Sequence, residues 1–322
     1  EGEFGDLHSL LVVRNGALVV EEYFAEGGSR HGPLIDSVYR DRPHHLASVT
    51  KTITSVLVGI AIDRGSIGSV QDPIIDYLPG YAHLLKGEKE AITIDHLITM
   101  SPGLEWSQQG PWDTTNDGRN LNYTDDVLRY VLQKELVATP GTRFAYSNGT
   151  PAVLGVILEN ATGMSIGEFA EKNLFEPLGI MDYGWSSYPD GTVEADGGLA
   201  LRPRDLAKIG QMVLDHGHWQ GSTVVSEEWL NHATEGRFVY STIGGEPVSY
   251  GSFWNRMVLP TPDGPVTAVF HGGTGGNFLT VIPDLDMVVV FTAAIFGRDP
   301  KRLYYPVLAE YILAGIDRST GH

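Results

Sequence analysis

The 322-residue sequence has no cysteine. Disulfide bonds, a thiolate nucleophile and cysteine–zinc sites are therefore excluded. The eleven histidines show no metal-binding spacing, and the His-Glu-x-x-His motif of metallohydrolases does not occur. No apolar run reaches transmembrane length, and the run from Leu10 to Val20 is interrupted by Arg14 and Asn15. We therefore expect a soluble protein without a metal, a cofactor or a membrane span.

Positive charge is also scarce. The chain has 22 basic and 40 acidic residues, a formal net charge of −18 and a pI near 4.9. This charge argues against nucleic acid or an anionic membrane as a partner. A hydrophobic content of 42% is ordinary for a globular chain, which at this length holds one large domain or two that pack closely. The first residue is Glu rather than Met, so we expect either that a leader has been cleaved or that the chain has been trimmed. The compartment stays open between the cytoplasm and, after leader removal, the periplasm or the exterior.

One of the seven lysines has an unusual position. Lys51 is the only lysine in the first 85 residues, and it follows Ser48 by three positions. Apolar residues then recur at helical spacing, which predicts a helix from about Ser48 to Gly65. Both side chains would lie on one face of this helix, about 5–6 Å apart at Cβ. Residues 52–62 carry no charge, so we expect most of the helix to be buried.

Ser48 and Lys51 together have the chemistry of an activated nucleophile. A serine hydroxyl needs a nearby base, and a lysine becomes one when burial and positive potential lower its pKa. The N-terminus of a helix adds backbone N–H groups and a dipole that favour negative charge on a substrate oxygen. The alternative is that Ser48 is an N-cap and Lys51 a solvated side chain. The single lysine at the start of an uncharged helix favours the catalytic interpretation.

A second candidate segment contains Tyr146 and Asn148, in a turn after Pro140-Gly141. A phenol next to an ammonium loses its proton more easily, so Tyr146 would be the general base for acylation and the acid for the leaving group. Asn148 would position Lys51 or donate to a substrate carbonyl. Taken alone, a Tyr-x-Asn sequence in a loop is more typical of a structural turn. The aperiodic loop from 104 to 122, with Trp106 and Trp112, is predicted either to line a binding site or to be a packed Ω-loop.

A third candidate is the glycine-rich turn from Phe270 to Asn277, between two predicted strands. Glycines let the backbone approach a ligand closely and leave N–H groups free to point at it. One such N–H would form an oxyanion hole with that of Ser48. The alternative is a plain hairpin turn. A nucleotide loop is excluded, because no Lys-Ser/Thr follows and no parallel β–α unit surrounds the segment.

Strand signals lie at both ends of the chain and helix signals in the middle. Helices are expected at 93–100, 124–136, 151–161, from Ser165, at 199–216, at 226–232 and at 304–316. Strands are expected at 7–13 and 17–24, joined by an Asn-Gly hairpin turn, and at 239, 249–258, 266–271, 278–282 and 287–293. This order predicts an α/β fold of the α+β type, an antiparallel sheet from the N- and C-terminal segments flanked by helices, with a mostly helical inserted domain. The expected sheet domain comprises residues 1–65 and 236–322 and the helical domain residues 66–235, with the active site between them.

The three candidate motifs, Ser48-x-x-Lys51, Tyr146-x-Asn148 and His271-x-Gly273, occur in the order found in one enzyme superfamily. The chain resembles the serine β-lactamases and penicillin-binding proteins over nearly its whole length. Within them it is similar to class C β-lactamases and the related esterases and 6-aminohexanoate-dimer hydrolases. The resemblance implies that Ser48 attacks a carbonyl, that Lys51 and Tyr146 handle its proton, and that water later releases the acyl group. It also implies a substrate-binding or oxyanion role for Asn148, His271, Gly272, Gly273 and Thr274.

The third motif departs from the family pattern. β-Lactamases and penicillin-binding enzymes have Lys-Thr-Gly there, and the lysine meets the carboxylate of a lactam or peptide. His271 stands at that place and is mostly neutral at pH 7, which weakens carboxylate recognition and favours small ester or amide substrates over penicillins. The second oxyanion donor would be Gly273 or Thr274.

The expected function is that of a serine hydrolase, a carboxylesterase related to β-lactamases. The alternatives are an amide hydrolase of the 6-aminohexanoate-dimer type, a weak β-lactamase, a D-Ala-D-Ala peptidase, or a sensor that is acylated without turnover. The segment Gly163-Met164-Ser165-Ile166-Gly167 matches the nucleophile elbow of α/β-hydrolases, but it follows a predicted helix rather than a strand. Ser165 and Glu168 are better explained as a capping box.

Overall fold

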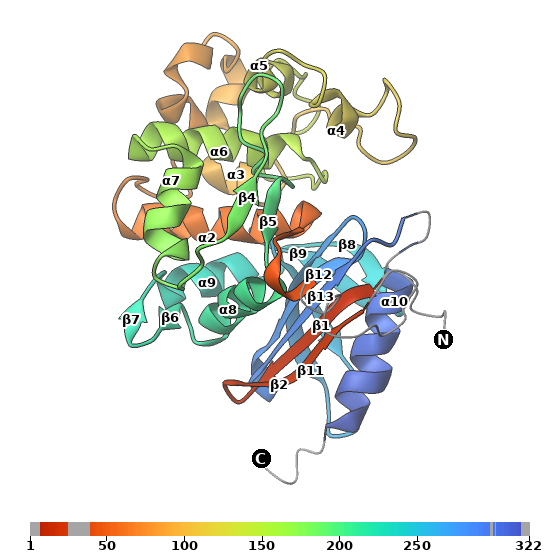
Figure 1. The fold of residues 1–322 in the computed structure, drawn as a ribbon. Helices are drawn as coiled ribbons and strands as arrows, with labels where there is room; N and C mark the ends of the chain where they lie inside the picture. Colours follow the sequence, from red (N-terminus) through yellow and green to blue (C-terminus); the bar gives the residue numbers. More distant parts are fainter. Residues whose placement is uncertain (1–6, 25–38, 297–298, 300, 317–322) are drawn as a thin grey trace.

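The computed structural model describes residues 7–24, 39–296, 299 and 301–316. Its largest element is an eight-stranded antiparallel sheet in the order β2-β1-β13-β12-β11-β10-β9-β8 (Figure 1). The strands of this sheet are β1 (Leu7–Arg14), β2 (Ala17–Tyr23), β8 (Phe238–Ile243), β9 (Glu246–Tyr250), β10 (Asn255–Leu259), β11 (Val266–Gly273), β12 (Asn277–Ile282) and β13 (Met287–Ala293). The sheet combines segments from both ends of the chain, which confirms the predicted fold class.

The N-terminal hairpin forms where the sequence predicts it. Asn15 and Gly16 adopt φ values of 50° and 71°, the left-handed backbone that a tight two-residue turn requires. On its other side β1 pairs with β13, from Leu7 opposite Ala293 to Arg14 opposite Met287. The N-terminal hairpin therefore extends the sheet formed by the C-terminal strands.

Helices and short strands fill the middle of the chain. The helices are α2 (Thr50–Asp63), α3 (Ile94–Ile98), α4 (Asp117–Asn120), α5 (Val127–Leu132), α6 (Gly149–Thr162), α7 (Ile166–Ala170), α8 (Pro203–Leu214), α9 (Glu227–Thr234) and α10 (Lys301–Pro306), which continues as a π-helix (Val307–Ile312). The short strands are β3 (His44–His45), β4 (Tyr183–Trp185), β5 (Leu199–Leu201), β6 (His218–Trp219) and β7 (Ser222–Thr223). None of the helices in the described ranges combines the length and apolar character needed to cross a bilayer.

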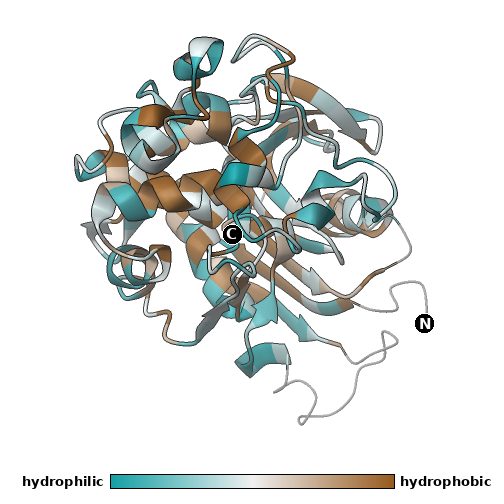
Figure 2. Cartoon of the chain, turned by 90° about the horizontal axis from the view of Figure 1, so that it is seen from above, coloured by the Kyte–Doolittle hydropathy of each residue, from teal (hydrophilic) through white to brown (hydrophobic). Residues whose placement is uncertain are grey.

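The strands bury side chains on both faces of the large sheet. On β13, Val288 and Val290 belong to the core shared with α2 and α8, whereas Val289 and Phe291 belong to a second core. That second core includes Tyr304 of α10, which stacks on Phe278 with ring centroids 3.9 Å apart. This alternation is typical of a strand that is covered on both faces. Hydrophobic segments accordingly gather in the interior of the molecule, and hydrophilic ones follow its outer loops (Figure 2).

The cover on one face of the sheet comes from α8. Gly210 lies so close to the sheet that a Cβ there would stand 2.5 Å from Val288 Cγ1 and 2.9 Å from Leu279 Cδ1. The apolar face of an amphipathic helix and the open face of a sheet bury each other in this way. This helix belongs to residues 66–235, the range predicted as the inserted domain, so part of that range contacts the sheet directly. The division at residues 65 and 235 stays a prediction.

Three predicted elements differ from the observed ones. The helix expected at 199–216 begins as β5, and α8 starts only at Pro203, because the segment before it pairs with β3 and β4. The strand expected at 249–258 is divided into β9 and β10 at residues 251–254, where Phe253 has a φ of 63°. The helix expected at 124–136 is limited to α5, which begins after Asp126, whose side chain accepts a hydrogen bond from Arg129 N.

Candidate active site

Ser48 lies in a 3₁₀ turn, η1 (Ala47–Val49), that leads directly into α2. Ala47 has a φ of 47°, a left-handed conformation that is rare for a residue with a Cβ. Leu199 of β5 holds both sides of the turn, because its carbonyl accepts from Leu46 N at 2.9 Å and its N–H donates to Thr50 Oγ1 at 3.2 Å. Neither η1 nor α2 has a side-chain N-cap, so the alternative that Ser48 is a capping residue is wrong.

Lys51 is completely buried at the start of α2. Its Nζ donates to Ser48 Oγ at 3.0 Å, to Asn148 Oδ1 at 3.1 Å and to the carbonyl oxygen of Asp196 at 2.7 Å. The contact with Ser48 follows from the spacing of one helical turn that the sequence predicts. The alternative of a solvated Lys51 is wrong, because the side chain has no exposed surface.

Tyr146 places its ring beside Lys51. The Nζ atom lies 5.2 Å from the centroid of the ring. This ring and that of the buried Tyr250 form a T-shaped pair, with centroids 6.3 Å apart and planes at 84°. None of the hydrogen bonds found among the described residues engages the Tyr146 hydroxyl. The structure therefore brings the phenol next to Lys51 without a hydrogen bond between the two, and its role as a base stays a prediction.

Asn148 contacts Lys51 because another residue performs the capping at the start of α6. Ser147 Oγ accepts hydrogen bonds from the backbone N–H groups of Gly149 at 3.0 Å and Thr150 at 3.3 Å. The side chain of Asn148 makes no capping bond to the helix, although Asn148 occupies the N-cap position. Its amide oxygen is therefore free to accept from Lys51, which fits the positioning role that the sequence predicts.

Gln108 is a site residue that the sequence does not reveal. Its Oε1 accepts from Asn148 N at 2.8 Å and from Trp106 Nε1 at 2.9 Å. The loop of residues 104–122 is thereby fastened to the residue that contacts Lys51. The sequence indicates that this loop could line a binding site, because it is aperiodic and contains tryptophans. No local pattern distinguishes Gln108 from its neighbours within the loop.

His271 is buried on β11, and its ring has one hydrogen bond. The contact from Nδ1 to Gly272 O is 2.9 Å, and because a carbonyl oxygen only accepts, it places the proton on Nδ1. Nε2 is buried without a partner in the described residues. Burial and the nearby charge of Lys51 lower the pKa of His271 to about 3, so the ring is neutral at pH 7.

The glycine-rich turn passes directly against η1. A Cβ at Gly273 would stand 2.3 Å from Leu46 O and 3.1 Å from Ser48 N, so only glycine allows this approach. The turn itself uses Gly275 and Gly276 at φ values of 88° and 90°. The backbone of β11 therefore lies beside that of Ser48, as an oxyanion hole would require, and the choice between Gly273 and Thr274 as second donor stays a prediction.

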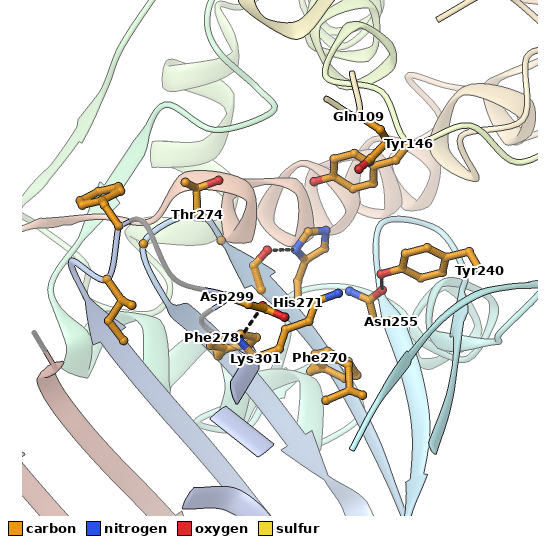
Figure 3. A pocket seen from close by; sticks show the side chains of 16 residues that line it. Gln109, Tyr146, Tyr240, Asn255, Phe270, His271, Thr274, Phe278, Asp299 and Lys301 are labelled. Atoms are coloured by element: carbon orange, nitrogen blue, oxygen red, sulfur yellow. Dashed lines mark hydrogen bonds between the residues drawn. The ribbon is translucent and has the colours of Figure 1, made fainter. Parts of the chain in front are cut away.

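A cavity of about 360 Å³ adjoins these residues (Figure 3). Tyr146 and Gln109 approach it from the helical side, and residues 270–275 from β11 and the following turn. Tyr240 and Asn255 lie at another side, where the Tyr240 hydroxyl donates to Asn255 Oδ1 at 2.7 Å. Of the predicted site residues, Tyr146, His271, Gly272, Gly273 and Thr274 line this space. No group of three or more His, Cys, Asp or Glu residues in the described ranges is arranged to hold a metal ion.

Comparisons with known proteins identify related chains. The sequence profile of the family described as Beta-lactamase matches residues 8–311. The 6-aminohexanoate-dimer hydrolase of Paenarthrobacter ureafaciens is 28% identical over 97% of this chain and 78% of its own length. The D-alanyl-D-alanine-carboxypeptidase/endopeptidase AmpH of Escherichia coli K12 is 24% identical over 91% of this chain and 79% of its own. Among solved structures, EstCE1, a hydrolase with promiscuous acyltransferase activity, matches with a TM-score of 0.73 at 17% identity, over 97% of this chain and 94% of that one.

Proposed function

The chain belongs to the β-lactamase family of serine hydrolases, and we propose that it hydrolyses small ester or amide substrates through an acyl-enzyme formed on Ser48. The observation that carries the proposal is the 3.0 Å hydrogen bond between Ser48 Oγ and the fully buried Lys51 Nζ. A nucleophile, a group that takes its proton and a neighbouring row of backbone N–H groups are the parts that acyl transfer needs.

The proposed reaction has two halves. In the first, Ser48 Oγ forms a bond to the substrate carbonyl carbon while its proton passes to the Lys51–Tyr146 pair. The pair then protonates the leaving alcohol or amine as the bond from carbon to that group breaks. In the second half, water gives a proton to the same pair and attacks the acyl carbon, and Ser48 leaves with a proton. The N–H groups of Ser48 and the β11 turn stabilise the negative oxygen in both halves.

An ester substrate is favoured over a penicillin by the charge at the third motif. His271 is neutral and buried, so it offers no cation to the carboxylate that β-lactams carry. The cavity also has apolar walls, among them Phe270, Phe278 and Ile243. The charged residues among those that line it are one acid and one base, Asp299 and Lys301, so the lining carries no net charge. We therefore assign a carboxylesterase activity toward uncharged acyl groups.

The test uses Ser48→Ala with p-nitrophenyl acetate and butyrate. We expect hydrolysis by the variant to fall to the rate without enzyme, because no other hydroxyl occupies that place. A fluorophosphonate probe should label the wild-type protein on the peptide that contains Ser48 and should not label the variant. Substantial residual activity in Ser48→Ala would remove Ser48 from the mechanism.

A second candidate is an amide hydrolase of the 6-aminohexanoate-dimer type. It is favoured by the relative of that name, which aligns with 97% of this chain. Matched substrates, p-nitrophenyl butyrate and butyryl p-nitroanilide, separate the two activities through their kcat/KM values. A sensor without turnover would instead release one equivalent of p-nitrophenol in a burst and then stop.

A further inference from the structure

The protonation state of Lys51 decides how it acts on Ser48. Asp196 O and Asn148 Oδ1 only accept hydrogen bonds, so they take two N–H groups of Lys51. The third position on Nζ faces Ser48 Oγ, and it holds an N–H in an ammonium or a lone pair in a neutral amine. Ser48 therefore accepts from a charged Lys51, and it can give up its proton to a neutral one.

Lys51 has no direct ion pair, although it is buried. None of the ion pairs formed by the described residues includes it. Burial without an opposite charge disfavours an ammonium strongly. A nearby carboxylate would offset that cost, and Asp196, whose carbonyl already accepts from Lys51, carries one.

The side chain of Asp196 is itself buried and has a specific partner. The hydroxyl of Tyr188 donates to Asp196 Oδ1 at 2.5 Å, and both residues are buried. Burial raises the pKa of Asp196 above its ordinary value, while the charge of Lys51 and the hydrogen bond from Tyr188 counteract part of that rise. Burial and the same carboxyl raise the pKa of Tyr188 well above its usual range, so Tyr188 remains a donor.

We propose that the carboxylate of Asp196, held by Tyr188, is the buried counter-charge of Lys51 and sets the proton affinity with which Lys51 acts on Ser48. The inference rests on the function proposed above. Asp196 and Tyr188 are positioning residues in this arrangement, because the side chain of neither contacts the reacting atoms. A negative charge near an amine favours its protonated form, so the ionised carboxyl raises the affinity of Lys51 for a proton.

Other titratable groups face this arrangement. Those that act on Asp196, Tyr188 or Lys51 are His45, Tyr146, Asp190, Glu194 and His271. His271 is neutral above a pH of about 3 and adds no charge in the working range. Ser186 Oγ donates a hydrogen bond to Glu194 at 2.9 Å. Burial is the main cause that raises the pKa of Glu194, and the charge of Asp196 raises it further. Asp196 differs from these five groups because its backbone carbonyl also accepts a hydrogen bond from Lys51.

The test is the pH dependence of Ser48 labelling by a fluorophosphonate probe, in wild type and in Asp196→Asn. Asparagine keeps the backbone carbonyl and an oxygen that accepts from Tyr188, and it removes only the charge. We expect the limb of the profile that reports Lys51 to move to lower pH by about one unit or more, because Lys51 gives up its proton more easily.

A second variant checks that the charge is the cause. Tyr188→Phe should move the same limb in the same direction, since a carboxylate without its donated hydrogen bond is less stable. When Tyr188→Phe is combined with Asp196→Asn, it should add no further shift, because Tyr188 acts through the charge of Asp196 and that charge has been removed. A purely structural role would instead lower the amount of folded protein and leave the limbs in place.

Asp72→Asn is the matched control. Asp72 also accepts from a tyrosine, Tyr77, at 2.6 Å, but it lies beyond the C-terminus of α2, at the opposite end from Ser48. This variant should leave the profile of Ser48 labelling unchanged. An unchanged profile in Asp196→Asn, or a shift to higher pH, would overturn the inference and leave the proposed function standing. Absence of labelling at Ser48 in the wild type would refute both.

Discussion

Among single residues, Tyr146 has the environment that most directly suggests a chemical role. Its ring lies 5.2 Å from Lys51 Nζ, and it lines the cavity. Its hydroxyl has no hydrogen bond within the described part of the chain, whereas the neighbouring Tyr240 donates to Asn255. This position is the one that the predicted role requires, in which Tyr146 carries the proton of Ser48 to the leaving group.

Tyr146→Phe tests this role, since the variant keeps the ring and loses only the hydroxyl. We expect kcat for p-nitrophenyl butyrate to fall by about 10²–10⁴-fold, the usual contribution of a general acid or base, with little change in KM. Steady-state kinetics at several pH values measure the effect. Tyr77→Phe is the control, because it removes the hydroxyl of a tyrosine that is hydrogen-bonded to Asp72, and its kcat should stay within about threefold of the wild-type value. If kcat of Tyr146→Phe fell by less than threefold, another group would have to move the proton.

At the scale of elements, the site depends on how closely β11 approaches η1. The strand places Gly273 against the backbone of residues 46–48, and the space left is too small for a Cβ. β5 holds the same turn from the other side through Leu199. The position of Ser48 is therefore set by two strands as well as by its own helix.

Gly273→Ala tests that contact. A Cβ 2.3 Å from Leu46 O must push β11 and η1 apart, so we expect activity to fall by about 10²-fold through misplacement of the nucleophile and its N–H donors. Unfolding free energy should fall by about 1–3 kcal/mol, the usual cost of overpacking. Gly184→Ala is the control, since the nearest atom to its new Cβ is 4.0 Å away. Equal rates for Gly273→Ala and wild type would show that the approach of β11 does not matter for catalysis.

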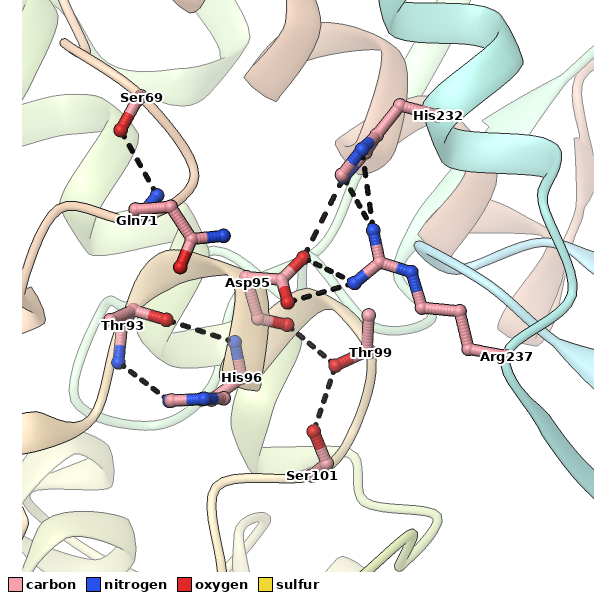
Figure 4. Close-up of polar contacts among 9 residues, drawn as sticks. All are labelled: Ser69, Gln71, Thr93, Asp95, His96, Thr99, Ser101, His232 and Arg237. Atoms are coloured by element: carbon pink, nitrogen blue, oxygen red, sulfur yellow. Dashed lines mark hydrogen bonds and ion pairs between the residues drawn. The ribbon is translucent and has the colours of Figure 1, made fainter. Parts of the chain in front are cut away.

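Across the whole molecule, a polar cluster connects the helical region to the sheet (Figure 4). Arg237, just before β8, donates from Nη1 to both carboxylate oxygens of Asp95 in α3, at 2.7 and 2.8 Å. His232 of α9 lies 3.6 Å from the same carboxylate. Burial acts to raise the pKa of Asp95, but the contact with His232 and the charge and hydrogen bonds of Arg237 outweigh it, so the pKa is lowered.

Arg237→Met measures what this cluster contributes to stability. We expect a loss of about 1 kcal/mol in unfolding free energy at pH 7, because the two hydrogen bonds join charged groups but Arg237 is exposed to solvent, which weakens them. Because the folded pKa of Asp95 lies below its unfolded value of about 3.9, the contribution is complete above that pH and is lost as the pH falls through the folded pKa. Urea unfolding at pH 7 and pH 3 should show a smaller wild-type advantage at pH 3 than at pH 7. The exposed pair of Arg129 and Asp126 is the control, where Arg129→Met should cost no more than about 0.5 kcal/mol.

Local patterns were sufficient for much of the fold. The turn at Asn15-Gly16, the capping box of Ser165 and Glu168, and the start of α2 near Ser48 are all present as predicted. Each depends on residues a few positions apart, whose spacing and backbone preferences are written in the chain itself. Two of the predictions that differed have different causes. The start of 199–216 pairs with β3, which lies far earlier in the chain, whereas 249–258 folds back on itself so that β9 and β10 pair with each other.

By itself the sequence determined that Ser48 and Lys51 share a helical face, because one turn separates them whatever surrounds the helix. Only the tertiary structure decided what else Lys51 contacts, since Asn148 and Asp196 lie 97 and 145 positions further along the chain. It also decided that His271 is buried and neutral, and that Gly273 meets the backbone of Ser48. Burial and close approach arise from packing the sheet against the helices, and no local pattern encodes that contact.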